Sequence, residues 1–133
     1  MIAGQLAECG ACIVSGMAYG IDKVAAIAAL ERSKAEIPTI AVLGSGVDVV
    51  YPEENRKLYD EICDKGAVVS EFLPGTVPDS KHFPQRNRII SGISRGVVVA
   101  EAAIKSGTRI TADFALEQGR DVFAIPGRIT DPF

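Results

Sequence analysis

Residues 38–70 read PTIAVLGSGVDVVYPEENRKLYDEICDKGAVVS, and this stretch predicts a strand–helix–strand unit. The apolar run 39–43 follows a proline and ends in a Gly-Ser-Gly turn, a pattern typical of a short buried strand. Pro52 and two glutamates mark the first turn of a helix, which Gly66 ends. Residues 67–70 form the next strand. Short apolar strands that alternate with helices are expected to run parallel.

The same alternation continues in both directions from this unit. Strands are predicted at residues 11–14, 39–43, 67–70, 97–100 and 122–125. Helices are predicted for residues 1–9, for a segment capped by Asp22, for 52–65 with Leu58 and Ile62 inward, for 86–93 and for the segment from Ser106 to Gln118. The strands are short, apolar and rich in Val and Ile, which is typical of strands buried on both faces of a parallel sheet. We therefore expect an α/β fold in three layers, with a mostly parallel sheet of about five strands and helices on both faces.

Length and composition indicate one soluble globular domain. The chain has 133 residues, of which 47% are apolar and 23% charged, with a net charge of −3. Its longest apolar runs are far shorter than a membrane span, and its start does not resemble a secretory leader. We expect a cytoplasmic protein with no membrane partner.

The three cysteines suggest neither a metal site nor a redox site. Cys9 and Cys12 form a C-x-x-C pair, but the pair straddles a helix end, where the helix dipole disfavours a thiolate. A structural zinc site would need two more ligands. Cys63 and His82 are the only other cysteine and histidine, and their spacing matches no zinc motif. Buried packing thiols and no metal are expected.

Residues 81–95, KHFPQRNRIISGISR, form a basic stretch in an acidic protein. The stretch contains four of the 14 basic residues and the only histidine, and no acidic residue falls between Asp79 and Glu101. The rest of the chain has ten basic and 17 acidic residues. A local concentration of positive charge indicates an anionic partner, and the alternative is a solvated basic helix face with no ligand.

The predicted topology gives this stretch a place in the fold. Right-handed crossovers bring the carboxyl ends of all strands to one edge of the sheet, where open α/β sheets bind their ligands. The segments at that edge are residues 15–20, 44–48, 71–88, 101–108 and 126–128. Several are glycine-rich turns that lead into helix N-termini, whose backbone N–H groups favour phosphate oxygens.

Other chemistries have weaker support. Residues 44–49 match only two glycines of a dinucleotide fingerprint, and no P-loop or nucleophile elbow is present. Glu71 and Glu101 are a candidate acid–base pair, although a buried ion pair with Arg86 or Arg88 is the favoured interpretation. Phe83 is placed to stack on a nucleic-acid base or, alternatively, to pack under the loop. We expect no enzymatic activity and no cofactor.

Five segments are similar to the DNA processing protein A family, also called DprA or Smf. They are VSGMAYGID (14–22), TIAVLGSGVDVVYP (39–52), VSEFLPGTVP (69–78), FPQRNRIISGIS (83–94) and SGTRITADFALEQGRDVFAIPG (106–127). The resemblance implies a Rossmann-like domain that binds single-stranded DNA and delivers it to the RecA recombinase during natural transformation. It also implies a homodimer or higher oligomer without catalytic activity.

The resemblance also assigns site residues. It implies that DNA is contacted by Lys81, Phe83, Arg86, Asn87, Arg88, Ser106, Gly107, Thr108, Ser15, Gly16, Gly44, Ser45 and Gly46. Compared with the family pattern, residues 1–133 are expected to be one domain that lacks the first strand and a C-terminal segment.

Two other functions stay open. One is a nucleotide-binding or nucleoside-monophosphate phosphoribohydrolase-like enzyme of a related Rossmann-like family. Its PGGxGTxxE motif is incomplete here, because Ile110 and Thr111 stand where its glutamate would be. The other is a folded remnant that mainly associates with itself or with a partner, for which exposed sheet edges are suited.

Overall fold

Short strands alternate with helices along the whole chain, as the sequence predicts. The computed structural model describes residues 2–103 and 106–127. The elements are α1 (Ile2–Glu8), β1 (Ile13–Ser15), α2 (Ile21–Arg32), β2 (Thr39–Val42), the 3-10 helix η1 (Glu53–Asn55), α3 (Arg56–Lys65), β3 (Ala67–Val69), α4 (His82–Ile93), β4 (Gly96–Val99), α5 (Gly107–Glu117) and β5 (Asp121–Ala124). They fall into two compact units, residues 1–82 and 83–133. The prediction of a single domain stays a prediction.

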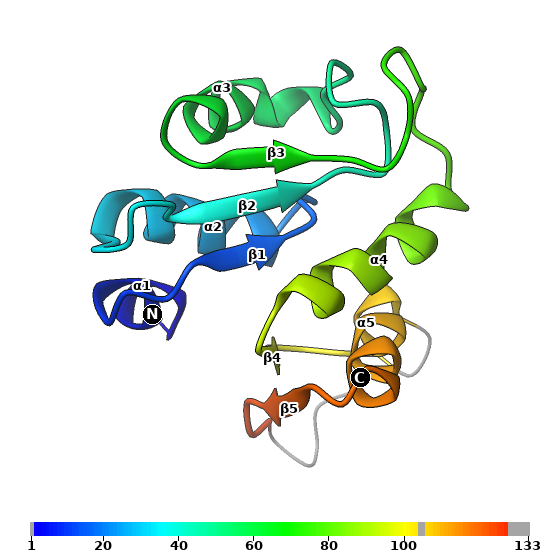
Figure 1. The fold of residues 1–133 in the computed structure, drawn as a ribbon. Coiled ribbons are helices and arrows are strands. Elements are labelled where there is room, and N and C mark those ends of the chain that lie inside the picture. The colour runs from blue at the N-terminus through cyan, green and yellow to red at the C-terminus, as the bar shows by residue number, and fades with distance from the viewer. Residues whose placement is uncertain (1, 104–105, 128–133) are drawn as a thin grey trace. The chain divides into compact units, whose positions relative to one another are not determined.

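The first unit is built on a parallel sheet of three strands in the order β1-β2-β3. Ile13 pairs with Thr39, and Ile40 pairs with Ala67, so β2 is the central strand. All three arrows point the same way in Figure 1, where α3 lies along β3. Helices α1 and α2 pack on each other and on β1, and α3 packs on β2 and β3. The predicted parallel α/β architecture is therefore confirmed.

The core of this unit forms where α3 meets the sheet. Leu58 and Ile62 are both buried, as their helical spacing predicts, and they pack with Leu43 of the strand end and with Met17. Gly66 ends α3, also as predicted. A side chain at position 66 would collide with the Thr39 carbonyl oxygen, so this position requires glycine.

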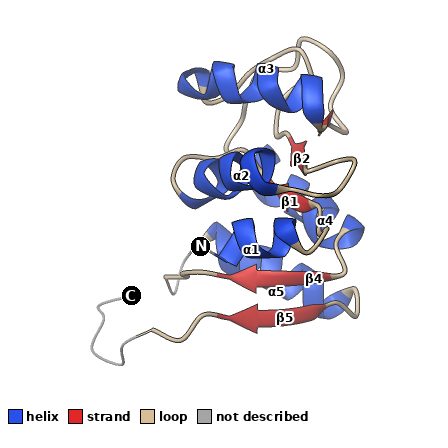
Figure 2. Ribbon diagram, turned by 90° about the vertical axis from the view of Figure 1, so that its left-hand side faces the viewer, coloured by secondary structure: helices blue, strands red, loops and turns tan. Residues whose placement is uncertain are grey.

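The second unit holds the remaining two strands. Strands β4 and β5 pair in parallel, and Figure 2 shows them side by side and pointing the same way. Helix α5 connects them and packs on both. Val98 of β4 lies opposite Phe123 of β5, and these side chains are 42% and 57% exposed. The prediction that every strand is buried on both faces is therefore wrong for these two. Five strands are present in the described residues, divided between a three-stranded and a two-stranded sheet.

Helix α4 begins at His82, four residues earlier than the predicted start at Arg86. Asp79 causes the earlier start, because its carboxylate accepts the Lys81 backbone N–H at 2.8 Å and its carbonyl accepts that of His82 at 3.0 Å. Pro84 then falls in the first turn, where the missing N–H of proline costs no helical hydrogen bond.

The cysteines contradict the prediction of buried thiols, since Cys9, Cys12 and Cys63 are all exposed and free. Partial desolvation still raises the pKa of Cys12, which disfavours its thiolate. Residues 2–103 and 106–127 contain no cluster of His, Cys, Asp and Glu that could hold a metal ion. Among the helices in those ranges, none has the length and apolar character that crossing a membrane requires.

Candidate functional site

The end of β1 and the turn after it contain two of the predicted DNA-binding residues, Ser15 and Gly16, both buried. The Gly16 N–H donates to the Asp22 carboxylate at 2.9 Å, and the Ala18 N–H donates to the same oxygen at 3.2 Å. Asp22 was predicted to cap α2, but the cap position is Gly20, and Asp22 lies inside the first turn. An internal carboxylate thus occupies N–H groups that would otherwise favour a phosphate.

A buried asparagine supports the same turn from another element. Met17 is fully buried and adopts a φ of 55°, a left-handed conformation that is uncommon outside glycine. Its carbonyl accepts the Asn55 Nδ2–H at 3.0 Å, and Asn55 is 1% exposed. Sequence reasoning missed Asn55, because an asparagine at the start of a helix reads as an ordinary surface residue.

The turn after β2 contains Gly44, Ser45 and Gly46, and it is tightly enclosed by the loop that follows β3. The Gly46 N–H donates to the Thr76 carbonyl at 2.9 Å. A side-chain carbon at position 46 would lie 2.7 Å from the Leu73 carbonyl oxygen. The glycine is therefore required by the close approach of this loop.

Two further hydrogen bonds join the turn to the loop. The Ser70 hydroxyl donates to the Ser45 carbonyl at 2.6 Å, and the Gly75 N–H donates to the Asp48 carboxylate at 2.7 Å. The Ser45 hydroxyl donates to the Val49 carbonyl at 2.8 Å. The proline-containing loop is thus fastened along its length, and we call these joined segments, residues 44–48 and 70–82, the stapled loop.

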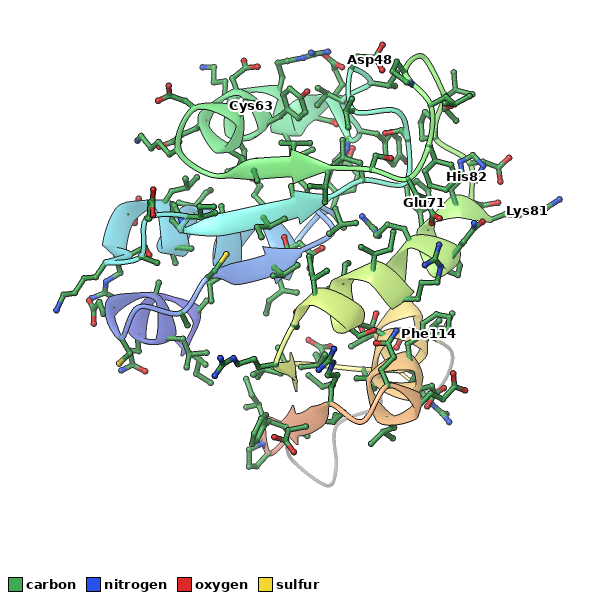
Figure 3. The ribbon with its side chains drawn as sticks, in the orientation of Figure 1. Asp48, Cys63, Glu71, Lys81, His82 and Phe114 are labelled. Atoms are coloured by element: carbon green, nitrogen blue, oxygen red, sulfur yellow. The ribbon has the colours of Figure 1, made fainter. Side chains whose placement is uncertain are left out.

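His82 closes the stapled loop at its far end. Its Nδ1 lies 3.2 Å from the Gly44 carbonyl oxygen. Its ring stacks on Phe72, with centroids 4.2 Å apart and planes inclined by 26°. Lys81 precedes it and is exposed, and Figure 3 shows the lysine extending away from the sheet. In the first unit, the predicted residue Lys81 therefore immediately precedes a histidine whose ring contacts the predicted residue Gly44.

In the second unit, the RNR motif of α4 contacts the Ser-Gly-Thr turn that begins α5. The Asn87 Nδ2–H donates to the Gly107 carbonyl at 3.3 Å, and the Asn87 Oδ1 accepts the Arg86 Nε–H at 3.1 Å. The Thr111 hydroxyl donates to the same Gly107 carbonyl at 3.3 Å. Two motifs that are 20 residues apart in the sequence thus meet through one amide side chain.

The arginines of this motif differ in exposure. Arg86 is 5% exposed, whereas Arg88 is exposed. The Arg88 backbone carbonyl accepts the Gln118 Nε2–H at 2.9 Å, and Gln118 also accepts the Ser91 hydroxyl at 2.7 Å. This amide fastens α4 to the end of α5, so the backbone that carries Arg88 is held while its side chain faces solvent. Sequence reasoning missed Gln118, which it treated only as the end of a helix.

The N-terminus of α5 has no side-chain cap among the described residues. Ser106 occupies the cap position without a side-chain cap bond, and its buried Oγ has no hydrogen-bond partner among the described residues. A side-chain carbon at Gly107 would meet no atom within 4 Å. Thr108 follows and is half-buried. Unlike the turn after β1, this helix start has no carboxylate bound to it in the residues described.

Three other candidates have less defined positions. Phe83 is half-buried, which is compatible with both roles that the sequence left open. Glu71 and Glu101 are both exposed, and the ion pair with Arg86 or Arg88 that the sequence favours stays a prediction. An ion pair formed by either would be screened by solvent.

Tyr19 and Glu54 form a surface pair in which the pKa of both groups is shifted. The Tyr19 hydroxyl donates to the Glu54 carboxylate at 2.6 Å. This bond raises the pKa of Tyr19 to about 12 and lowers the pKa of Glu54. The pair ties the turn after β1 to η1, a structural role that requires no ligand.

Charge is distributed unevenly between the units. Residues 1–82 include seven basic and 12 acidic side chains, whereas residues 83–133 include seven basic and five acidic ones. The predicted site residues are Ser15, Gly16, Gly44, Ser45, Gly46 and Lys81 in the first unit and Phe83, Arg86, Asn87, Arg88, Ser106, Gly107 and Thr108 in the second. Their shared role in binding DNA stays a prediction.

Known proteins resemble this chain along its whole length. The family model for DNA recombination-mediator protein A matches residues 1–133. DNA processing protein DprA of Streptococcus pneumoniae is 55% identical over 119 residues, which are 90% of this chain and 41% of that protein. Protein Smf of Escherichia coli is 49% identical over 128 residues, which are 96% of this chain and 33% of that protein. The chain thus spans less than half the length of these relatives.

Solved structures agree. The crystal structure of DNA processing protein A from S. pneumoniae superposes with a TM-score of 0.85 at 52% identity, covering 97% of this chain and 44% of that one. DNA processing protein A from Helicobacter pylori, whose structural study concerns its single-stranded DNA binding mode, superposes with a TM-score of 0.88 at 33% identity, covering 97% of this chain and 57% of that one. On sequence and fold together, the chain belongs to the DNA recombination-mediator protein A family.

Proposed function

We propose that this chain is the single-stranded DNA-binding core of a recombination mediator and that it grips the strand with little preference for base sequence. The observation that carries the proposal is the contact between Asn87 and the Gly107 carbonyl, which joins the basic α4 to the N-terminus of α5. Both chemical groups are suited to phosphate. A guanidinium supplies charge, and a free helix N-terminus supplies N–H donors and a positive dipole end.

The two arginines of the motif take different parts in this proposal. Arg88 is exposed and supplies charge to the DNA backbone, whereas Arg86 is buried and donates to Asn87, so it holds the motif in place. Phe83 and Lys81 supply base stacking and a further charge. The acidic balance of the first unit, 12 acidic to seven basic residues, restricts the polyanion to the basic part of the surface.

Fluorescence anisotropy of a labelled oligo-dT across a salt series tests the proposal. Binding to a polyanion releases counterions, so the affinity should fall steeply as salt rises, with a slope of about 0.7 per phosphate contact for a single strand. Arg88→Ala should lower the affinity about two- to fivefold, the range for one solvent-exposed ion pair, for every base composition alike. It should also reduce the slope by about 0.7.

Arg56→Ala is the matched control. It removes one positive charge from an exposed side chain that is paired with Glu53 at 3.1 Å and is not among the predicted site residues. It should leave both affinity and slope unchanged. Equal losses for the two variants, or a slope that Arg88→Ala does not change, would show that the binding is a general charge effect and would refute the assignment.

The wider role follows from the family. The description of the family as a recombination mediator supports RecA as the recipient of the bound strand, and pull-down of RecA with and without oligo-dT tests this. We also propose a homodimer, a cytoplasmic location and no catalytic step. Light scattering measures the oligomeric state, and the absence of base release from nucleoside monophosphates would exclude the phosphoribohydrolase alternative, which the relatives do not favour.

A further inference from the structure

We propose that His82 is a positioning residue whose imidazole fastens the start of α4 to the Gly44 turn and thereby fixes Lys81 for DNA. The inference rests on the proposed function. The sequence alone shows His82 only as the single histidine of the basic stretch, at no zinc-motif spacing. The structure instead directs its Nδ1 to the Gly44 carbonyl oxygen at 3.2 Å and stacks its ring on Phe72.

The hydrogen bond determines the proton position on the ring. A carbonyl oxygen only accepts hydrogen bonds, so Nδ1 must carry the proton, and in the neutral ring Nε2 is then the unprotonated nitrogen. Stacking on Phe72 also fixes the plane of the His82 ring. Figure 3 shows His82 beside the loop that follows β3, while Lys81 extends away from it. One side chain thus faces inward and its neighbour faces solvent.

The rest of the stapled loop makes this arrangement rigid. Gly46, Ser45 and Asp48 each hold one point of the loop by a hydrogen bond, to Thr76, Ser70 and Gly75. His82 is the last of these fastenings, immediately after Lys81 and at the first residue of α4. On the other side of Lys81, the Asp79 carboxylate accepts the Lys81 N–H at 2.8 Å, but Asp79 lies on the same segment and does not join it to the sheet. A lysine loses much rotamer and backbone freedom when it binds, and a fixed backbone reduces that cost.

The first test measures the tautomer. His82 is the only histidine in the chain, so ¹⁵N-edited NMR of the imidazole at about pH 8.5, where imidazole side chains are neutral, gives a spectrum without ambiguity of assignment. The expected result is a protonated Nδ1. A protonated Nε2 would overturn the proposal, and this result does not depend on whether the chain binds DNA.

The second test measures oligo-dT affinity in variants that separate donor from ring. His82→Asn places an amide donor where Nδ1 lies, and His82→Phe keeps an aromatic ring on Phe72 but removes the donor. His82→Phe should weaken binding about two- to twelvefold, the range that the net contribution of one hydrogen bond gives, and His82→Asn should recover part of the loss. Unchanged affinity in His82→Phe would overturn the positioning role.

A double-mutant cycle with Lys81→Ala shows whether His82 acts through the lysine. If it does, His82→Phe should have no further effect once Lys81 is alanine. Additive losses would overturn the proposal, because they indicate a direct DNA contact or a general loss of structure. Circular dichroism confirms folding of each variant, and His82→Asn keeps the test decisive if His82→Phe fails to fold. If the wild-type chain does not bind oligo-dT, the proposed function fails. The tautomer measurement still tests whether His82 donates a hydrogen bond to the Gly44 carbonyl.

Discussion

Gly46→Ala should destabilise the first unit, although it adds a single methyl group. The added carbon would lie 2.7 Å from the Leu73 carbonyl oxygen, 2.8 Å from an Asp48 carboxylate oxygen and 2.9 Å from the Gly75 nitrogen. Non-bonded heavy atoms prefer about 3.5–4.0 Å. Two of the three atoms belong to the backbone, so rotation of a side chain cannot relieve the collision, and the loop must move away.

The expected size follows from what that movement breaks. The hydrogen bond from Gly46 to Thr76 and the bond from Gly75 to Asp48 both cross the gap that would open. Each contributes about 0.5–1.5 kcal/mol net, which gives a loss of about 1–3 kcal/mol in the free energy of unfolding. The cost of overpacking a tight interior is independently about 1–3 kcal/mol, so the two approaches agree.

Urea denaturation followed by tyrosine fluorescence measures this loss in the relevant unit. The chain has no tryptophan, and its three tyrosines, Tyr19, Tyr51 and Tyr59, all lie in residues 1–82. Gly107→Ala, followed by circular dichroism, is the control, because nothing lies within 4 Å of the added carbon and alanine is the better helix former. A change for Gly46→Ala of less than about 0.5 kcal/mol, the usual scatter for surface substitutions, would refute the reasoning about close approach.

Three further outcomes follow from single contacts. Glu54→Gln should lower the pKa of Tyr19 from about 12 toward 10, as measured by ultraviolet absorbance during alkaline titration, and an unchanged value would mean that the carboxylate is not the cause. In the wild type, the stability from this bond is present above the ordinary titration range of the Glu54 carboxyl and below pH 10; it is lost as the pH rises through about 12 and also as the pH falls and protonates Glu54. Asp22→Ala should cost about 1–3 kcal/mol in urea denaturation, because it leaves two backbone N–H groups of the turn after β1 without their acceptor, and Asp22→Asn, which keeps an oxygen, should cost less. Asn87→Ala should weaken oligo-dT binding and lower amide protection at the start of α5 in hydrogen exchange. Unchanged binding would show that the contact between Asn87 and the Gly107 carbonyl is not needed for binding.

Much of the candidate site could be placed from the sequence, because the topology of parallel strands is encoded locally. Glycine-rich turns after apolar runs, and the basic stretch that includes α4, located the residues near strand ends and helix starts. The sequence could not show what each polar group contacts. Asp22 and Asp48 are carboxylates of similar appearance, yet one binds the turn after β1 and the other binds a loop 27 residues away.

The sequence by itself determined the order of strands and helices, the positions of the helix stops and the membership of the family, because periodicity, glycine and proline act over a few neighbouring residues. Tertiary structure alone decided which of these side chains are exposed to solvent and which are buried. Arg86 and Arg88 are two residues apart in one motif, but one is buried and the other is exposed. The only histidine became a fastening because Gly44 and Phe72 lie beside it in space. The physical reason is that a hydrogen bond or a buried charge depends on partners from distant segments, and packing selects those partners.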